Sequence, residues 1–238
     1  MCFRSDGSGV PISDPKAGVI TLQQFGDLFE ARLSRDRIRP YVSATDGSVE
    51  RVVALYEWNL SASAEVLKII AVVEVVLRNS ISSSFESFSR SNSGDGFWLS
   101  DSRILPFARQ RDAVEHALKK VTAQNREPTL SAVIPELSFG FWRFLLTKRY
   151  GAMFWSPVLQ YAFPEVRHGA ERALFDRVGR LHRLRNRIAH HEPIFGRRLD
   201  LDHRDCLLVL GAVCPVTAKW AEGISRIPEV LANTPLLR

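Results

Sequence analysis

The sequence predicts an all-α protein, and three observations support this fold class. Apolar residues recur at helical spacing over several long segments of the chain. No alternation typical of a strand is sustained over several residues, and no glycine-rich phosphate loop is present. With 238 residues, of which 45% are hydrophobic, the chain can bury a sizeable core and does not belong to the disordered class.

The first residues differ in composition from the rest. Residues 1–18 are rich in Gly, Ser, Pro and Asp, which predicts a flexible tail, and residues 19–238 are expected to form a single domain. A capping-box pattern at Thr21–Gln24 followed by an apolar stripe predicts a helix over roughly residues 21–36. Basic residues before Pro40 indicate a solvated face, with contact to an RNA backbone as the alternative.

Residues 48–89 lack proline and glycine and keep helical spacing, which predicts one long helix or two nearly collinear helices with a break near residues 59–61. Glu74 and Arg78 are spaced as an i,i+4 ion pair among valines. Such a pair is either a buried structural pair or a contribution to an active site.

Residues 92–155 are predicted to form a loop, a helix and an aromatic part of the core. Residues 92–96 predict a loop, and Pro106 suits the first turn of a helix that ends near Gln124. The aromatic residues of segment 129–155 could stack on bases, but their helical spacing favours packing in the core. Lys148 and Arg149 are candidates for contact with phosphate.

Prolines indicate helix boundaries in the last third of the chain. Pro157 and Pro164 are expected to bound a short connection, after which a helix runs from about residue 165 to 191. The apolar segment 201–224 contains Pro215, which predicts a kink or break near Ala212. Cys206 and Cys214 are expected to pack there as small hydrophobes.

Segment 177–195 is a basic helix with one apolar seam. Leu181, Leu184 and Ile188 can bury one stripe, which leaves arginines and histidines on the remaining surface. Pro193 ends the helix and places His190 and His191 in the last turn. There the two histidines could stabilise the helix C-terminus, by roughly 0.3–1 kcal/mol each, or transfer protons at neutral pH.

Charge and cysteine content limit the partners and the compartment. Lys and Arg number 32 against 26 Asp and Glu, so the net charge of +6 favours polyanions, with nucleic acid ahead of an anionic membrane surface. Three cysteines without ligand spacing, no signal peptide and no apolar run long enough to span a bilayer fit a cytoplasmic protein. We expect neither a metal site nor a cofactor, because residues 190–192 would point three ligands in different directions.

Segment 177–195 also carries a resemblance to a known family. Arg185, Asn186 and His190 match the motif of the HEPN ribonucleases, and the run from Leu184 to Phe195 resembles the signature of Abi-like (abortive infection) proteins in that superfamily. Further similarity lies upstream, at residues 56–59, 74–79, 139–146, 150–151 and 154–155. The resemblance covers roughly residues 20–225.

This resemblance implies a HEPN-type helical bundle with additional helices and a metal-independent endoribonuclease activity, in a toxin or phage-defence effector. His190 would take the proton of the ribose 2′-OH or protonate the leaving 5′ oxygen, Arg185 would stabilise the phosphorane, and Asn186 would orient His190. The products would be a 2′,3′-cyclic phosphate and a 5′-hydroxyl. Supporting roles are assigned to His182, His191, Glu192, Glu74 and Arg78, and RNA binding to Arg180, Arg183, Arg187, Arg197, Arg198, Lys148 and Arg149.

Helix geometry limits how the motif could act. Arg185 lies about 140° around the helix from His190 and about 7.5 Å along its axis, so one straight helix does not bring them together. Either the last turn opens, or a second copy of the helix supplies the partner residue; the resemblance favours a homodimer formed through this helix. Two alternatives remain, a non-catalytic RNA- or protein-binding module and a basic all-α scaffold. Any antitoxin would be a separate molecule.

Overall fold

The computed structural model describes residues 32–45, 48–92 and 94–237. Across these ranges the elements are helical and no strand is present, which confirms the predicted all-α class. The described chain divides into two compact units; the first contains residues 32–45, 48–56 and 235–237, and the second contains residues 57–92 and 94–234. The predicted boundary at residue 18 lies outside the described residues, and a single domain over residues 19–238 stays a prediction.

The first unit contains α2 (Arg35–Ala44) and the first two turns of α3 (Val49–Ser91). Ser34 precedes α2 with a left-handed φ of 68°, so the helix predicted over roughly 21–36 does not run unbroken through its last residues; most of that range lies outside the described chain. Pro40 lies inside α2. The ring of Tyr41 is buried against Tyr56, with centroids 5.1 Å apart.

Helix α3 is one continuous element of 43 residues, so of the two predicted alternatives the single helix is correct. The polar residues near position 60 do not break it. Instead Asn59 is buried, 4% exposed, and its Oδ1 accepts a hydrogen bond from the backbone N–H of Ile194, at 2.7 Å. Asn59, which the sequence suggested as a helix break, therefore joins α3 to the chain that follows α9 (Glu171–Ala189).

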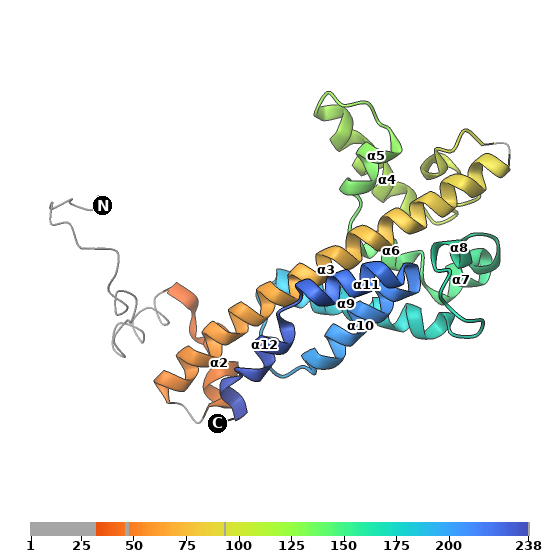
Figure 1. The fold of residues 1–238 in the computed structure, drawn as a ribbon. Helices are drawn as coiled ribbons and strands as arrows, with labels where there is room; N and C mark the ends of the chain where they lie inside the picture. Colours follow the sequence, from red (N-terminus) through yellow and green to blue (C-terminus); the bar gives the residue numbers. More distant parts are fainter. Residues whose placement is uncertain (1–31, 46–47, 93, 238) are drawn as a thin grey trace, which may run out of the picture. The chain divides into compact units, whose positions relative to one another are not determined.

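The remaining helices of the second unit follow in short succession along the chain (Figure 1). They are η2 (Trp98–Ser100), α4 (Ala108–Ala123), α5 (Leu130–Val133), η3 (Ile134–Glu136), α6 (Phe139–Phe144), α7 (Lys148–Phe154), η4 (Trp155–Leu159), α8 (Gln160–Ala162), α9 (Glu171–Ala189), α10 (Leu199–Val213), α11 (Pro215–Ile224) and α12 (Ile227–Ala232). A last short turn, η5 (Pro235–Leu237), belongs to the first unit.

Three predicted boundaries need correction. Pro106 precedes the N-cap of α4, Phe107, and so lies just outside the first turn. Pro157 lies within the helical turn η4, so the segment after it is mostly helical instead of a connection. Helix α9 begins at Glu171 and not near residue 165, because Gly169 adopts a left-handed φ of 86° that interrupts the backbone before it.

The predicted loop is confirmed at the described residues of 92–96, and the break predicted near Ala212 because of Pro215 is confirmed at Cys214. Gly96 has a left-handed φ of 93° in the loop that ends α3. Cys214 is extended between α10 and α11, and Pro215 occupies the first position of α11, where its missing N–H is tolerated. Cys206 is buried in α10 as expected, while Cys214 is only partly buried.

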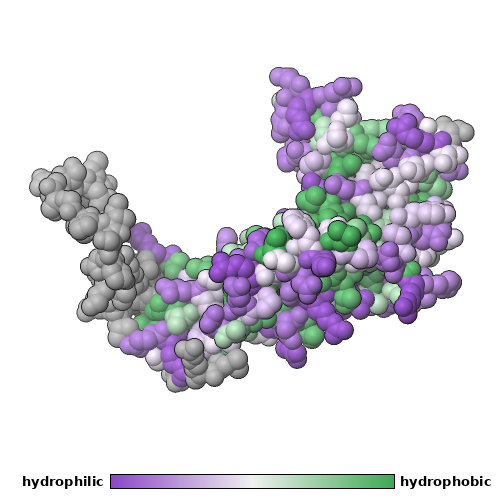
Figure 2. Space-filling view, in the orientation of Figure 1, coloured by the Kyte–Doolittle hydropathy of each residue, from purple (hydrophilic) through white to green (hydrophobic). Residues whose placement is uncertain are grey.

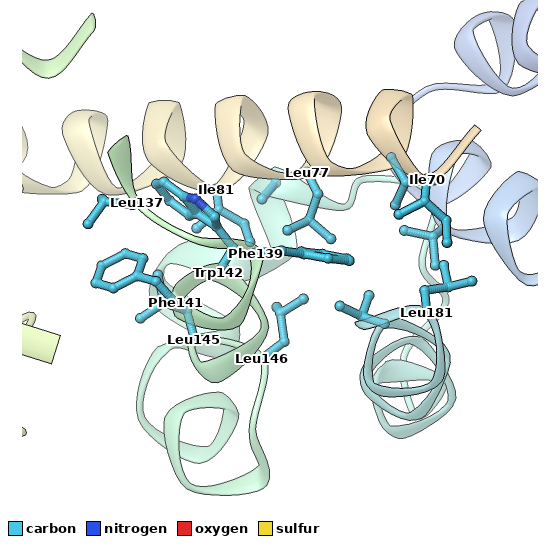
Figure 3. Close-up of a cluster of buried hydrophobic side chains, with 14 of the residues drawn as sticks. Ile70, Leu77, Ile81, Leu137, Phe139, Phe141, Trp142, Leu145, Leu146 and Leu181 are labelled. Carbon is cyan, nitrogen blue, oxygen red and sulfur yellow. The ribbon is translucent and has the colours of Figure 1, made fainter. Parts of the chain in front are cut away.

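The aromatic residues of segment 139–155 pack in the core, as predicted. Phe139 and Trp142 are fully buried below α3, where Leu77 and Ile81 point toward them, and Ile70 lies above Leu181 (Figure 3). Leu181 of α9 joins the same cluster. Helix α6 is therefore held between α3 and α9 by large apolar side chains, which contribute about 1.5–3 kcal/mol each when fully buried.

The surface of the second unit carries both polar and apolar residues. Hydrophilic residues predominate over α4 and α5 (Figure 2). Among the described residues, no helix is long and apolar enough to cross a membrane.

The hydrogen bond between Asn59 and Ile194 is expected to matter for stability. The change Asn59→Ala removes the acceptor and leaves a buried N–H unpaired, which costs about 1–3 kcal/mol. Urea unfolding would measure the loss. The control Asn79→Ala removes an exposed asparagine of the same helix and should change the free energy of unfolding by less than about 0.5 kcal/mol. Equal effects of the two changes would contradict the assigned role.

Candidate functional site

Helix α9 presents a polar face because its other face is buried. The apolar stripe of the helix is almost fully inaccessible to solvent, with buried residues Leu174, Val178, Leu181, Leu184 and Ile188. His182, Arg185 and Asn186 are three and four residues apart, so they share one side of the helix. This side faces a cleft.

The cleft has a volume of about 390 Å³, and we call it the His182 cleft. Its walls come from α4, α6 and α9. The lining residues are Arg109, Gln110, Ala113, Ser138, Phe139, Gly140, Phe141, Arg143, Phe144, His182, Arg185 and Asn186. The cleft thus combines two residues of the predicted motif, Arg185 and Asn186, with residues from helices far away in the sequence.

The charges of the His182 cleft have one sign. Arg109, Arg143 and Arg185 line it, and none of the lining residues is a carboxylate. Among the ion pairs of the described chain, none joins these three arginines to an acidic group. Guanidinium groups left without a carboxylate partner in a partly enclosed cleft attract anions and can bind a phosphate in a bidentate manner.

His182 lies within this positive environment. Its Nε2 is 3.4 Å from Nδ2 of Asn186, and its ring meets that of Phe139 edge to face with centroids 5.7 Å apart. Burial lowers the pKa of His182 below its ordinary value, and the positive charges of Arg143, Arg185 and Arg183 lower it further. In the free protein the imidazole is therefore held in its neutral form at neutral pH.

Gly140 makes room for the imidazole of His182. A Cβ atom built on Gly140 would lie 3.3 Å from Nε2 of His182, closer than most real contacts. Helix α6 therefore approaches α9 closely at this point because residue 140 has no side chain.

Sequence reasoning missed part of the cleft. It did not select Arg109, Gln110 or Arg143 as site residues, although Arg143 is the only cation within the aromatic run of residues 139–146. Gln110 is buried, and its Oε1 has no hydrogen-bond partner. A cation or amide surrounded by core residues is a usable signal for a site, but only the fold shows that these residues face α9.

His190 does not line the cleft. It is the C-cap of α9, with an exposed side chain, and its backbone N–H donates to the carbonyl of Asn186. The structure thus places Arg185 and Asn186 in the His182 cleft and His190 outside it. This agrees with the geometric expectation that one helix does not bring Arg185 and His190 together.

The chain leaves α9 through a Schellman motif. The N–H of His191 donates to the carbonyl of Ile188, and the N–H of Glu192 to that of Arg187. His191 has a left-handed φ of 55°, a position at which glycine is usual. Arg187 fixes the turn, since Nη2 donates to the carbonyl of Pro193 at 2.9 Å and Nη1 lies 3.4 Å from the Glu192 carboxylate.

Several arginines predicted to bind RNA lie around a second cleft of about 590 Å³. Here carboxylates neutralise them. Arg180 lies 2.7 Å from the carboxylate of Asp205, which Arg177 also contacts, and Arg197 pairs with Asp202 at 2.7 Å. Arg198 pairs with Asp200 at the surface. Asp202 and Asp205 are both buried near the start of α10. Their ion pairs join α10 to the arginines of α9 and to Arg197 in the loop before α10.

The other predicted residues do not line the His182 cleft. Arg183 and Lys148 are exposed, and the guanidinium of Arg149 lies 4.2 Å from the centre of the Phe107 ring, a cation–π contact. Glu74 and Arg78 both lie on α3, but no ion pair joins them, and Nε of Arg78 is buried without a hydrogen-bond partner. The expected i,i+4 pair is thus absent from this part of the described chain.

Fold and cleft together define an all-α protein with a basic, carboxylate-free cleft. Within the described ranges, no group of three or more His, Cys, Asp or Glu side chains could hold a metal ion. No family model, no curated protein and no solved structure matches this chain.

The left-handed backbone of His191 leads to a test of the helix end. At this position His191→Gly should be more stable than His191→Ala by about 1 kcal/mol, because glycine adopts positive φ without steric cost. Thermal unfolding would compare the two variants. At Ala189, the exposed last residue of α9, the order should be reversed, with glycine about 0.5–1 kcal/mol less stable than alanine. If alanine were more stable than glycine at both positions, backbone strain at His191 would be excluded.

Proposed function

We propose that this protein is a metal-independent endoribonuclease of the HEPN, Abi-like kind. The observation that supports the proposal most is the composition of the His182 cleft, where Arg185 and Asn186 of the motif lie beside Arg109 and Arg143 without any lining carboxylate. Such a cleft suits a polyanion whose backbone carries one charge per residue. Arg185 would stabilise the negative charge that develops on the attacked phosphate.

The position of His190 decides how the motif would work. Since His190 lies outside the cleft, at the end of α9, its imidazole would reach a scissile phosphate held by Arg185 of another copy. We therefore propose a homodimer in which two α9 helices face one another and share their motif residues. His190 would remove the 2′-OH proton or protonate the 5′ oxygen, and the products would be a 2′,3′-cyclic phosphate and a 5′-hydroxyl.

In the cell, such an enzyme would act as a toxin or phage-defence effector on cytoplasmic RNA. A separate antitoxin or regulatory protein would then restrain it. Support for this part of the proposal comes only from the resemblance of residues 184–195 to Abi-like proteins.

A non-catalytic RNA-binding module on the same fold is the second candidate. The observation that favours it is the separation of His190 from the cleft, because the cleft residues alone could hold a phosphate without cutting the strand. The two candidates differ in cleavage and not in RNA affinity.

Cleavage should depend on both motif residues. In EDTA, Arg185→Ala and His190→Ala should each lower the rate of RNA cleavage by at least about 100-fold, since each removes a group that acts in the transition state. The control Arg172→Ala removes an exposed arginine of the same helix and should keep the activity. Rates and product ends on total RNA and tRNA would be measured by electrophoresis. RNA binding without cleavage by the unmodified protein would favour the binding module.

A shared site predicts complementation between two inactive variants. Mixed and re-equilibrated Arg185→Ala and His190→Ala proteins should recover about a quarter of the normal activity, because half of the dimers are mixed and each has one intact site of two. Either variant mixed with itself gives the background. No recovery, with mixed dimers shown by mass spectrometry, would exclude a site shared between copies.

A further inference from the structure

The His182 cleft is complete within one chain, whereas the proposed cleavage site needs two. Its walls are contributed by α4, α6 and α9 of the second unit, and its arginines lie on three different helices. An anion could therefore bind in it whether or not a second copy is present.

We infer that the His182 cleft binds the phosphate group of a nucleotide, within RNA or free, and that His182 takes up a proton from water as the phosphate enters. The inference rests on the proposed role of the cleft in holding RNA, but it does not depend on cleavage.

The charges around His182 support a phosphate ligand. Arg143 of α6, Arg185 of α9 and Arg109 of α4 line the cleft, and the exposed Arg183 adds positive charge that acts on His182 from outside the lining. None of the groups that line the cleft is a carboxylate, so the described residues offer no internal anion to the arginines. Forked guanidinium donors match the oxygens of a phosphate, and a bound anion also compensates the mutual repulsion of the arginines.

The remaining walls suit the rest of a nucleotide. Phe144, which is only partly buried, supplies apolar surface, and Gln110 offers a buried amide whose Oε1 has no hydrogen-bond partner. A buried amide oxygen without a hydrogen-bond partner is costly, and a ligand group that donates a hydrogen bond to it would remove that cost. The volume of about 390 Å³ lies within the range of sites for small molecules.

Proton uptake follows from the change in charge around His182. In the free protein, burial and three arginines favour the neutral imidazole, and Asn186 can donate to its Nε2. A phosphate in the cleft adds negative charge, which favours the imidazolium and a hydrogen bond from it to a phosphate oxygen. The pKa of His182 should therefore rise on binding, and affinity should increase as the pH falls toward and below the pKa of the complex.

The test uses a ligand whose own charge does not titrate. A 2′-O-methyl dinucleotide carries one phosphodiester and resists cleavage, whereas phosphate monoesters titrate near pH 6. We expect its affinity for the full-length protein to increase at least about threefold from pH 8 to pH 5, the effect of a pKa rise of about half a unit. Nuclear magnetic resonance of the His182 ring, with and without ligand, should show that rise directly.

Two histidine variants isolate the responsible group. His182→Gln should abolish the pH dependence of binding, whereas His116→Gln, at an exposed position of α4, should keep it. Gly140→Ala, whose Cβ would press on Nε2 of His182, should weaken binding. An unchanged pKa of His182 at saturating ligand, or the same pH dependence in His182→Gln, would overturn the inference.

Comparison of ligands separates the two sources of phosphate. Tighter binding of the dinucleotide than of a nucleoside 5′-monophosphate indicates RNA, and the opposite order indicates a free nucleotide. Inorganic phosphate serves as the reference without a base. Binding of the uncleavable dinucleotide is measured separately from cleavage of RNA, so loss of cleavage and loss of binding can be told apart.

Discussion

The burial of one stripe of α9 is the constraint on which the candidate site depends. Five apolar side chains of this helix are inaccessible to solvent, and Leu181 packs in the cluster that also contains residues of α3 and α6. This packing fixes the rotation of α9 about its axis. His182, Arg185 and Asn186 must then face α4 and α6, since their spacing leaves them no other side of the helix. The charge of the cleft is a result of core packing, because the buried stripe determines which cations face inward.

Helix α9 ends where the proposed chemistry would begin. The Schellman motif, the left-handed His191 and the contacts of Arg187 all fix the chain just after the helix. The hydrogen bond from Ile194 to Asn59 then joins the following turn to α3. The backbone directly after His190 is therefore held by several hydrogen bonds. In the proposed dimer, where His190 would approach a phosphate held by another copy, a backbone held in this way would have few conformations to lose on binding.

The sequence alone predicted what depends on local periodicity. The apolar spacing of α3, the core role of the aromatic run and the break at Pro215 were all confirmed, and each follows from neighbouring residues. It did not predict what depends on contacts between distant segments. A break was considered near Asn59 because the sequence does not show its hydrogen-bond partner, the N–H of Ile194, which is 135 residues away. Arg109 and Arg143 line the cleft only because α4 and α6 pack beside α9, which the sequence does not show. Arg180 and Arg197, which were predicted to bind RNA, form ion pairs with carboxylates of α10.

Helix α6 belongs to the core and to the cleft at once. Phe139 and Trp142 are buried in the apolar cluster, while Gly140 and Arg143 form a wall of the cleft within the same six residues. The width of the cleft is therefore coupled to the volume of the side chains behind it. A variant sought for higher thermal stability at Trp142 or Ile81 would therefore alter the shape of the cleft as well, although neither residue lines it.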